Sequence, residues 1–289
     1  MRTNAIVRIV LFSLAILVLL GILVTGIFFG MFMVDTNFSI GDLTVSLGSE
    51  IINGTVSSSG TVDADQIDRI SIDWAAGSIT LQPGDVEDIT FQETGSFQED
   101  EAMVWNQNGK TLEIQFCRSK VSFGISYDSS VKDLVITVPR DWNCAELELD
   151  AASAKVMISD LLVNVVDFDG ASGTLTLENC SVEQLDIDTA SGDVRFTGTL
   201  LELDCDAASA DITCILVNTP TRIDMDMASG DLDLTMPENC GFTLSMDTLS
   251  SDFTSDFATS SRNGSHIYGD GRCKITVDGM SGDVFIRKG

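Results

Sequence analysis

The sequence predicts an all-β fold: a β-solenoid stacked from repeats of about 19 residues, preceded by one N-terminal transmembrane helix. Three observations support this prediction. A short phrase recurs at nearly constant spacing, apolar and polar residues alternate on both sides of that phrase, and the first 34 residues contain a long uncharged apolar run. Alternation with a period of two is typical of half-buried strands, and a fixed recurrence is typical of stacked repeats.

The N-terminal segment, residues 1–34, is unlike the rest of the chain. From Ile9 to Val34 there are 26 residues without a charge, which is longer than the roughly 20 needed to span a bilayer core. No Ala-x-Ala cleavage site follows, so an uncleaved anchor in the lipid bilayer is favoured over a signal peptide. Arg2 and Arg8 precede the run and Asp35 follows it. The positive-inside rule therefore predicts a single-pass protein of the cell membrane, with a cytoplasmic N-terminus and an extracytoplasmic C-terminal domain.

Two regions separate this segment from the regular repeats. Residues 35–66 are rich in Ser, Gly, Thr and Asp and are interpreted as an extracytoplasmic spacer with a strand or two, in which 54–60 is the best linker. Residues 67–138 carry β-rich runs at 70–72, 79–81, 89–91, 112–114 and 134–138. Turn signals at 83–85 and 106–110 and an acidic loop at 93–102 are expected between them.

The repeat is clearest from Leu185 to Phe196, where two alternating runs flank Ala190-Ser191-Gly192. Leu185, Ile187, Val194 and Phe196 are expected to point inward. The third small residue of each turn falls at 154, 173, 192, 210, 230, 251 and 282, giving steps of 19, 19, 18, 20, 21 and 31 residues. The last step leaves room for an inserted loop. Turns that close antiparallel hairpins in a sandwich or prism remain an alternative, although hairpin lengths vary more than these steps.

The recurring Leu-x-Ile-x-x-x-Ser-Gly-Asp-Val unit, the Val138-Pro139 pair and the N-terminal apolar run resemble the bacterial putative-adhesin family of β-strand-repeat proteins, a family of unknown function. The resemblance covers residues 67–289. It implies a β-solenoid-like domain displayed outside the membrane, and it supplies no catalytic residues. Ala154, Ala210 and Ser251 stand at the glycine position in their copies, which suggests that the turn tolerates a Cβ there.

Composition excludes some functions. Lys and Arg total 16 against 44 Asp and Glu, a formal net charge of −28, so nucleic acid is not expected as a partner. A single histidine, His266, leaves no His-rich metal site and no base for the recurrent turn serines. No catalytic, cofactor-binding or metal-ligating residue is assigned, and the chain is not expected to be an enzyme.

A column of aspartates is the feature closest to a site. Like charges on neighbouring strands repel, so something must offset the repulsion. One interpretation is that each carboxylate caps its own turn. The other is that the column gathers Ca²⁺, although the nonapeptide of calcium-binding solenoids is absent. The column consists of Asp150, Asp169, Asp188, Asp206, Asp226, Asp247 and Asp278.

Cysteine and tryptophan add smaller expectations. None of the seven cysteines forms a Cys-x-x-Cys pair. Cys144 and Cys240 occupy equivalent places in distant repeats and are predicted not to pair, and Cys205 is predicted to be buried. Trp74, Trp105 and Trp142 are expected in the core or at the solenoid cap rather than on a carbohydrate platform. The run 140–142 is the one exposed-looking mixed cluster.

These observations leave three functional hypotheses. The first is a membrane-anchored, non-catalytic, adhesin-like protein that presents an acidic repeat surface to a cell-wall polymer or surface protein. The second is a sensor of envelope state that acts on a membrane partner. The third, an acidic-polysaccharide lyase or a glycosidase on a β-helix, is disfavoured because a lyase acting on an acidic polymer needs a basic cleft, and Lys and Arg are scarce in the repeats.

Overall fold

The computed structural model describes residues 37–40, 43–46, 52–117 and 131–289, and this part of the chain is all-β, with two short 3₁₀ turns, η1 (Ala64–Gln66) and η2 (Glu99–Glu101). The predicted transmembrane run, 9–34, lies outside the described residues. Within them, no helix is both long and apolar enough to cross a bilayer. Strands β1 (Asn37–Ile40) and β2 (Leu43–Ser46) pair antiparallel as a separate small sheet.

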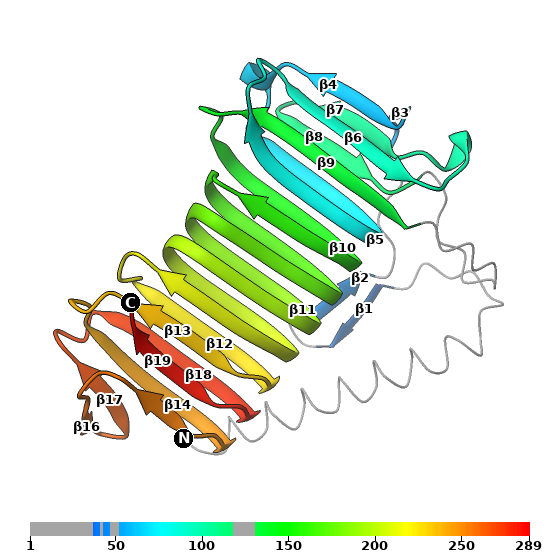
Figure 1. The fold of residues 1–289 in the computed structure, drawn as a ribbon. Coiled ribbons are helices and arrows are strands. Elements are labelled where there is room, and N and C mark those ends of the chain that lie inside the picture. The colour runs from blue at the N-terminus through cyan, green and yellow to red at the C-terminus, as the bar shows by residue number, and fades with distance from the viewer. Residues whose placement is uncertain (1–36, 41–42, 47–51, 118–130) are drawn as a thin grey trace.

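The repeats form a stack of coils whose strands run parallel from one coil to the next (Figure 1). The middle of the stack consists of β5 (Arg69–Gly84), β10 (Cys144–Ser159), β11 (Leu162–Leu216), β12 (Arg222–Ser229) and β13 (Leu232–Met236). Cys144 lies beside Val163 and Glu202 beside Arg222, offsets of one repeat. Each coil has two arms joined at the small-residue corner, and both arms pair with neighbouring coils rather than with each other. This pairing supports the predicted solenoid-like stack and overturns the antiparallel-hairpin alternative.

The C-terminal coils are not stacked in chain order. Strand β18 (Cys273–Ser281) pairs with β12 on one side and with β14 (Phe242–Ser250) on the other. Likewise β19 (Val284–Lys288) lies between β13 and β15 (Phe253–Ser255). The last repeat is therefore inserted before the penultimate one, which corrects the sequential order that the sequence suggested. Strands β16 (Ser260–Arg262) and β17 (Ser265–Tyr268) form the hairpin that occupies the long final step.

The N-terminal end shows the same inversion. Strands β8 (Thr111–Gln115) and β9 (Lys132–Pro139) form a coil outside β5, although they follow β5 in sequence. Four strands pair antiparallel around this coil: β3 (Thr55–Val56), β4 (Ser59–Val62), β6 (Ile89–Gly95) and β7 (Val104–Asn108). The predicted linker 54–60 is thus part of the sheet. A Cβ on Gly54 would lie 2.2 Å from the Trp105 carbonyl oxygen, which shows how closely the backbones pack.

The core follows the predicted alternation. Leu185, Ile187, Val194 and Phe196 are at most 2 % exposed. The predicted β-rich runs at 70–72, 79–81, 89–91, 112–114 and 134–138 all lie in strands. Burial of four such side chains contributes roughly 1.5–3 kcal/mol each, which offsets much of the ordering entropy of a coil.

The corners have two backbone conformations. Gly173, Gly192, Gly230 and Gly282 have φ between +124° and +156°, and a Cβ there would lie 1.9–2.3 Å from a carbonyl oxygen of the adjacent coil. Ala154 and Ala210 are not at positive φ, and their methyl groups are buried. The corner therefore accepts a Cβ at this position, as expected from the sequence, but with a different backbone conformation from the glycine corners.

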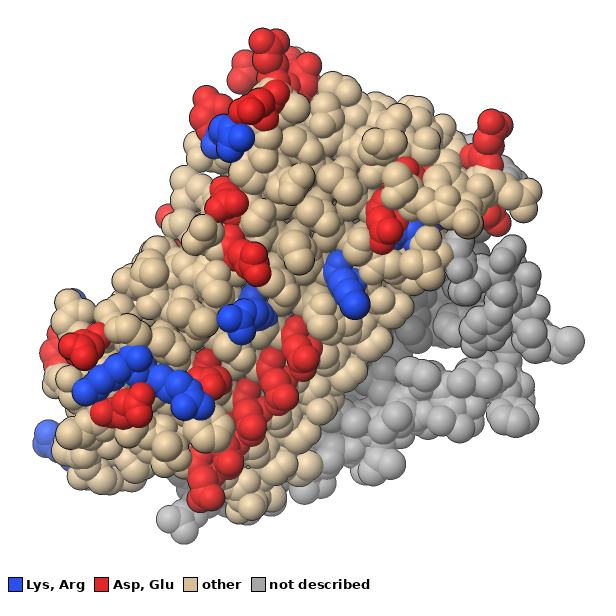
Figure 2. Space-filling model, viewed as in Figure 1, with Lys and Arg blue, Asp and Glu red and all other residues tan. Residues whose placement is uncertain are grey.

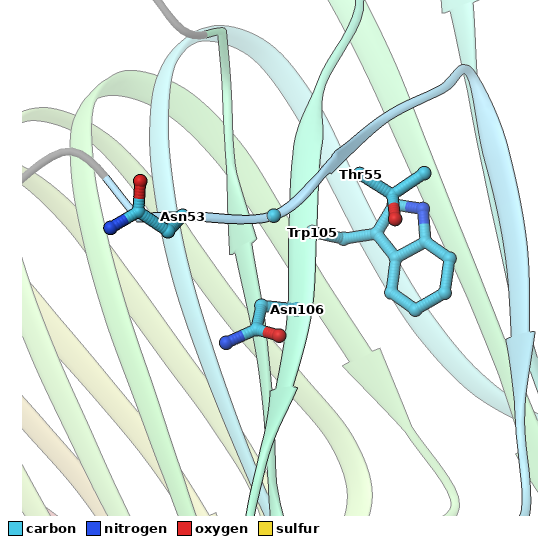
Figure 3. Close-up of a pocket in the computed structure, with 5 residues that line it drawn as sticks. Asn53, Thr55, Trp105 and Asn106 are labelled. Atoms are coloured by element: carbon cyan, nitrogen blue, oxygen red, sulfur yellow. The ribbon is translucent and has the colours of Figure 1, made fainter.

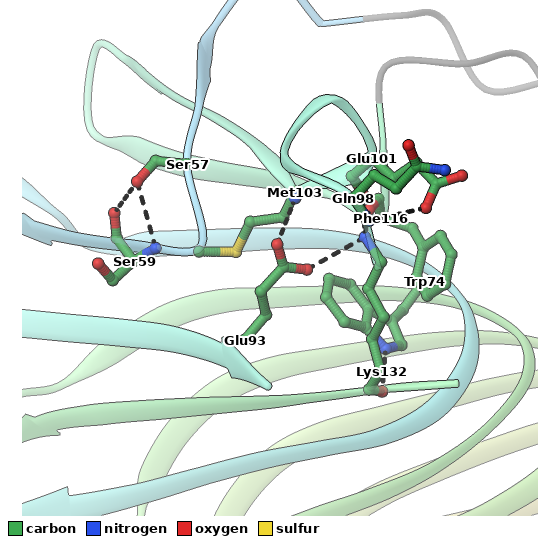
Figure 4. Close-up of polar contacts among 9 residues, drawn as sticks. All are labelled: Ser57, Ser59, Trp74, Glu93, Gln98, Glu101, Met103, Phe116 and Lys132. Carbon is green, nitrogen blue, oxygen red and sulfur yellow. Dashed lines mark hydrogen bonds and ion pairs between the residues drawn. The ribbon is translucent and has the colours of Figure 1, made fainter. Parts of the chain in front are cut away.

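A buried ion pair closes the N-terminal end of the core (Figure 4). Lys132 occupies the corner position that pairs with Gly77 of the adjacent coil. Its Nζ lies 3.1 Å from Glu93 Oε2, and both side chains are fully buried. Nζ also donates to the carbonyl oxygens of Glu101 (2.5 Å) and Phe116 (2.6 Å). Glu93 ends the buried part of β6, so the segment predicted as an acidic loop begins inside the core.

Candidate functional site

The predicted aspartates form a continuous row along the stack, the acidic ladder, and the structure adds one member. Asp73 pairs with Asp150, and Asp150 pairs with Asp169. Neighbouring coils lie about 4.8 Å apart, so the carboxylates repeat at that spacing. The corrected stacking order gives Asp73, Asp150, Asp169, Asp188, Asp206, Asp226, Asp278 and Asp247.

A second acidic row lies two residues upstream on the same arm. It contains Glu148, Asp167, Asp186, Asp204 and Asp224. Arg222 neutralises one end, with its guanidinium 3.1 Å from Asp204 and 2.5 Å from Asp224. Within the described chain, Asp150, Asp169, Asp188 and Asp206 have no ion pair with Lys or Arg. No basic side chain of the described residues therefore compensates the carboxylates in the middle of the ladder.

Burial and mutual repulsion make these carboxyl groups weak acids. Partial burial, then Asp169 and Asp73, raises the pKa of Asp150 to about 7. Burial, then Asp188 and Asp226, raises the pKa of Asp206 to about 6. The pKa values of Asp169 and Asp188 are also raised, mainly by burial. For Asp169, the neighbouring Asp150 side chain acts against this rise in pKa.

A third acidic row follows the corner on the other arm, and here the carboxylates of Asp211, Asp231 and Asp283 each accept a backbone hydrogen bond. The Asp231 N–H donates to Asp211 Oδ1 (3.0 Å), the Asp283 N–H to Asp231 Oδ1 (2.7 Å), and the Asp252 N–H to Asp283 Oδ1 (2.9 Å). These bonds join successive coils. Figure 2 shows a diagonal file of acidic side chains crossing the stacked coils on the face in view. Acidic rows thus flank the small-residue corners on both sides.

The prediction that ladder aspartates cap their own turns is wrong for Asp150, Asp169, Asp188 and Asp206, whose carboxylates make no hydrogen bond to the turn backbone. Backbone capping belongs instead to the third row and acts between coils. The recurrent Asp after the corner at 193, 211, 231, 252 and 283 was a signal in the sequence for that row.

The corner serines have a structural role where their bonds are resolved. Ser153 Oγ donates to the Ala75 carbonyl at 3.2 Å, and Ser191 Oγ donates to the Ala171 carbonyl at 3.4 Å. Both bonds run to the corner of a neighbouring coil. The single histidine, His266, packs against Phe253, with the two ring centroids 4.6 Å apart and the ring planes tilted.

The geometry of the rows also bears on metal binding. Across the described ranges, no group of three or more His, Cys, Asp or Glu side chains converges on one point. Carboxylates in a straight row each face outward, whereas Ca²⁺ needs six to eight oxygen ligands around one centre.

The aromatic and mixed clusters are mostly structural. Trp74 and Trp142 are buried and donate from Nε1 to the carbonyl oxygens of Lys132 and Ile67, which confirms their predicted core role. The exposed cluster at 140–142 does not form, because Trp142 turns inward and Arg140 pairs with Asp85 at 2.7 Å. An open pocket of about 380 Å³ is lined by Asn53, Gly54, Thr55, Trp105 and Asn106. The Trp105 indole points away from the two asparagine amides (Figure 3), so it offers no stacking platform there.

Six of the seven cysteines are hydrophobic core residues. The side chains of Cys144, Cys180, Cys205, Cys214, Cys240 and Cys273 are buried and form no disulfide in the described part of the chain, whereas Cys117 is partly exposed. Cys205 is fully buried beside Met225, as predicted. Insertion of β18 between β12 and β14 places Cys240 one coil farther from Cys144 than chain order suggests.

A family profile described as Toastrack DUF4097 matches residues 67–287, which is the whole of the coil stack described above. The chain belongs to the Toastrack DUF4097 family. The family predicted from the repeats is thereby confirmed. No curated protein matches the Toastrack chain.

Several solved structures are similar to this chain. A putative lipid binding protein from Parabacteroides distasonis is 17 % identical, with a TM-score of 0.47, and covers 82 % of this chain and 99 % of its own. A putative adhesin from the same organism is 14 % identical, with a TM-score of 0.44 and coverage of 82 % and 98 %. A putative adhesin from Bacteroides fragilis is 13 % identical, with a TM-score of 0.39 and coverage of 80 % and 95 %.

Proposed function

We propose that this Toastrack chain is a non-catalytic binding protein, anchored in the cell membrane by residues 9–34, that presents its acidic rows outside the cytoplasm to a wall polymer or surface protein. One observation carries the proposal: the uncompensated middle of the acidic ladder, a straight row of carboxylates at coil spacing without ion-paired cations. A periodic negative surface attracts a partner with positive groups and gives binding that weakens with salt.

The test is binding of the full-length protein in detergent to purified cell-wall fragments, measured by co-sedimentation at rising salt. The triple variant Asp169→Asn, Asp188→Asn and Asp206→Asn removes charge from the ladder and is expected to lose most of the binding. A matched triple substitution of exposed acids outside the rows, Glu178→Gln, Glu183→Gln and Asp141→Asn, removes the same charge and is expected to retain it. Equal loss in both variants would refute a role for the ladder itself.

A second candidate, a sensor of envelope state, is favoured by the raised pKa values of the ladder, about 7 for Asp150 and about 6 for Asp206. Such groups titrate in the mildly acidic range, so the surface charge follows the pH outside the membrane. This candidate predicts a membrane partner that co-purifies in detergent at pH 8 and not at pH 5.5, or the reverse. Co-purification that is independent of pH would count against it.

Calcium binding by the ladder is a separate proposal with its own test. A native-state ligand must raise the melting temperature by mass action. Thermal melts of the full chain with calcium and with chelator therefore decide it, and equal melting temperatures would dismiss calcium.

A further inference from the structure

The two ends of the coil stack are finished differently. At the N-terminal end, β3, β4, β6 and β7 pair antiparallel around the outer coil. At the C-terminal end, the β16–β17 hairpin pairs with residues 242–244 of β14. Its side chains reach farther, because Ser265 Oγ lies 2.9 Å from Ser245 Oγ and the His266 ring lies 4.6 Å from the Phe253 ring. No strand of the described chain pairs with the outward side of residues 246–250. This run is called here the free edge.

The free edge has little of the usual protection. Natural edge strands avoid unwanted pairing through charged residues, especially lysine, through proline and bulges, or through a covering element. Residues 246–250 contain no Lys, Arg or Pro, and their one charged residue is Asp247. Leu249, on this edge, is 72 % exposed. Unpaired backbone N–H and C=O groups and an exposed leucine together make this edge competent to accept another strand.

A second copy of the same edge fits it without a clash of charges. A two-fold axis perpendicular to the sheet pairs the two β14 strands antiparallel. Centred on Thr248, the register places Thr248 opposite itself and Asp247 opposite Leu249 of the second copy. Threonine pairs are favourable across strands. Centring on Asp247 would instead oppose two carboxylates, which is unfavourable.

We propose that two copies of this chain pair through the free edge, which joins their coil stacks tail to tail. Because both copies contribute the same edge, the contact is isologous and closes as a dimer instead of continuing into a filament. The inference goes beyond the proposed function: it assigns an interface and does not depend on what the acidic rows bind. Each chain has a formal net charge of −28, so salt screens their repulsion and strengthens the dimer.

Native mass spectrometry of the full chain released from detergent tests the proposal by counting chains of 31.0 kDa. The wild type is expected to be dimeric at about 10 μM, and more so at higher salt. Leu249→Glu places a carboxylate opposite Asp247 of the second copy and is expected to weaken association at least tenfold. Val217→Glu is the matched control, because Val217 is 71 % exposed and lies away from the free edge. It is expected to remain dimeric.

A cross-link tests the register. Residues directly opposite in an antiparallel pair lie within disulfide range, so Thr248→Cys is expected to form a covalent dimer on mild oxidation. Val217→Cys and the wild-type chain are expected not to. A wild-type chain that is monomeric at 100 μM would overturn the proposal. It would do so even if the monomer bound a basic peptide at this edge. A Leu249→Glu dimer as tight as wild type would do so too, as would failure of Thr248→Cys to cross-link.

Discussion

Replacing Asp150 by Asn should stabilise the protein at neutral and alkaline pH. In the folded chain Asp150 lies between Asp73 and Asp169, and burial followed by these neighbours raises its pKa from 3.8 to about 7. At 1.36 kcal/mol per pH unit, such a rise corresponds to roughly 4 kcal/mol of destabilisation of the ionised form. Asp150 retains contact with solvent and is coupled to its neighbours, so the screened contribution is about 1–2 kcal/mol.

The sign follows from proton linkage. Because the folded pKa is above the unfolded one, the folded state binds more protons between about pH 4 and pH 7. The stability of the wild type therefore falls as pH rises through that window, and the penalty is complete above about pH 7. Asp150→Asn removes the ionisable group, so its advantage is expected to be about 1–2 kcal/mol at pH 8 and near zero at pH 4.

Urea unfolding followed by tryptophan fluorescence at pH 8, 6 and 4.5 measures this difference. Glu183→Gln is the matched control, because Glu183 is an exposed acid outside the acidic rows. It should follow the wild-type curve at each pH. Parallel pH profiles for Asp150→Asn and wild type, or a less stable variant at pH 8, would refute the account of the ladder as a row of repelling carboxylates.

Three further perturbations probe the corners, the buried ion pair and the inserted repeat. Gly230→Ala should cost about 3 kcal/mol, since Gly230 has φ +124° and its new Cβ would lie 1.9 Å from a carbonyl oxygen. Gly264→Ala, at φ +85° with nothing within 4 Å, should cost only about 1 kcal/mol, and equal losses of melting temperature would contradict the corner argument. Lys132→Met should cost about 3–5 kcal/mol in urea unfolding because it leaves Glu93 buried and unpaired, and adding Glu93→Leu should recover most of it. Deletion of 273–289 removes strands paired on both sides, so circular dichroism should show loss of cooperative unfolding; a sharp transition at the wild-type temperature would show that the outer coil can replace the missing one.

The candidate site was only partly readable from the chain. The aspartate before each corner recurs at repeat spacing, so the ladder could be found in the sequence, as could the buried positions of Leu185 and Phe196. The chemistry of the ladder could not be predicted from the sequence. Whether a carboxylate caps a turn or bonds to the next coil depends on distances between coils. Burial, followed by the carboxylates of the neighbouring coils, raises the pKa of Asp150 to about 7, and both depend on the stacking.

By itself, the sequence determined the period of the repeat, the inward and outward faces of each arm and the positions of the corners. These are local properties, because side chains alternate with a period of two and a small corner residue marks each reversal. Only the tertiary structure decided the order of the coils. Backbone hydrogen bonds carry the pairing between parallel strands, and they are the same whichever repeat supplies them. Two placements therefore depended on how the ends of the stack could be closed. One is the insertion of β18 between β12 and β14, and the other is the pairing of Lys132 with Gly77.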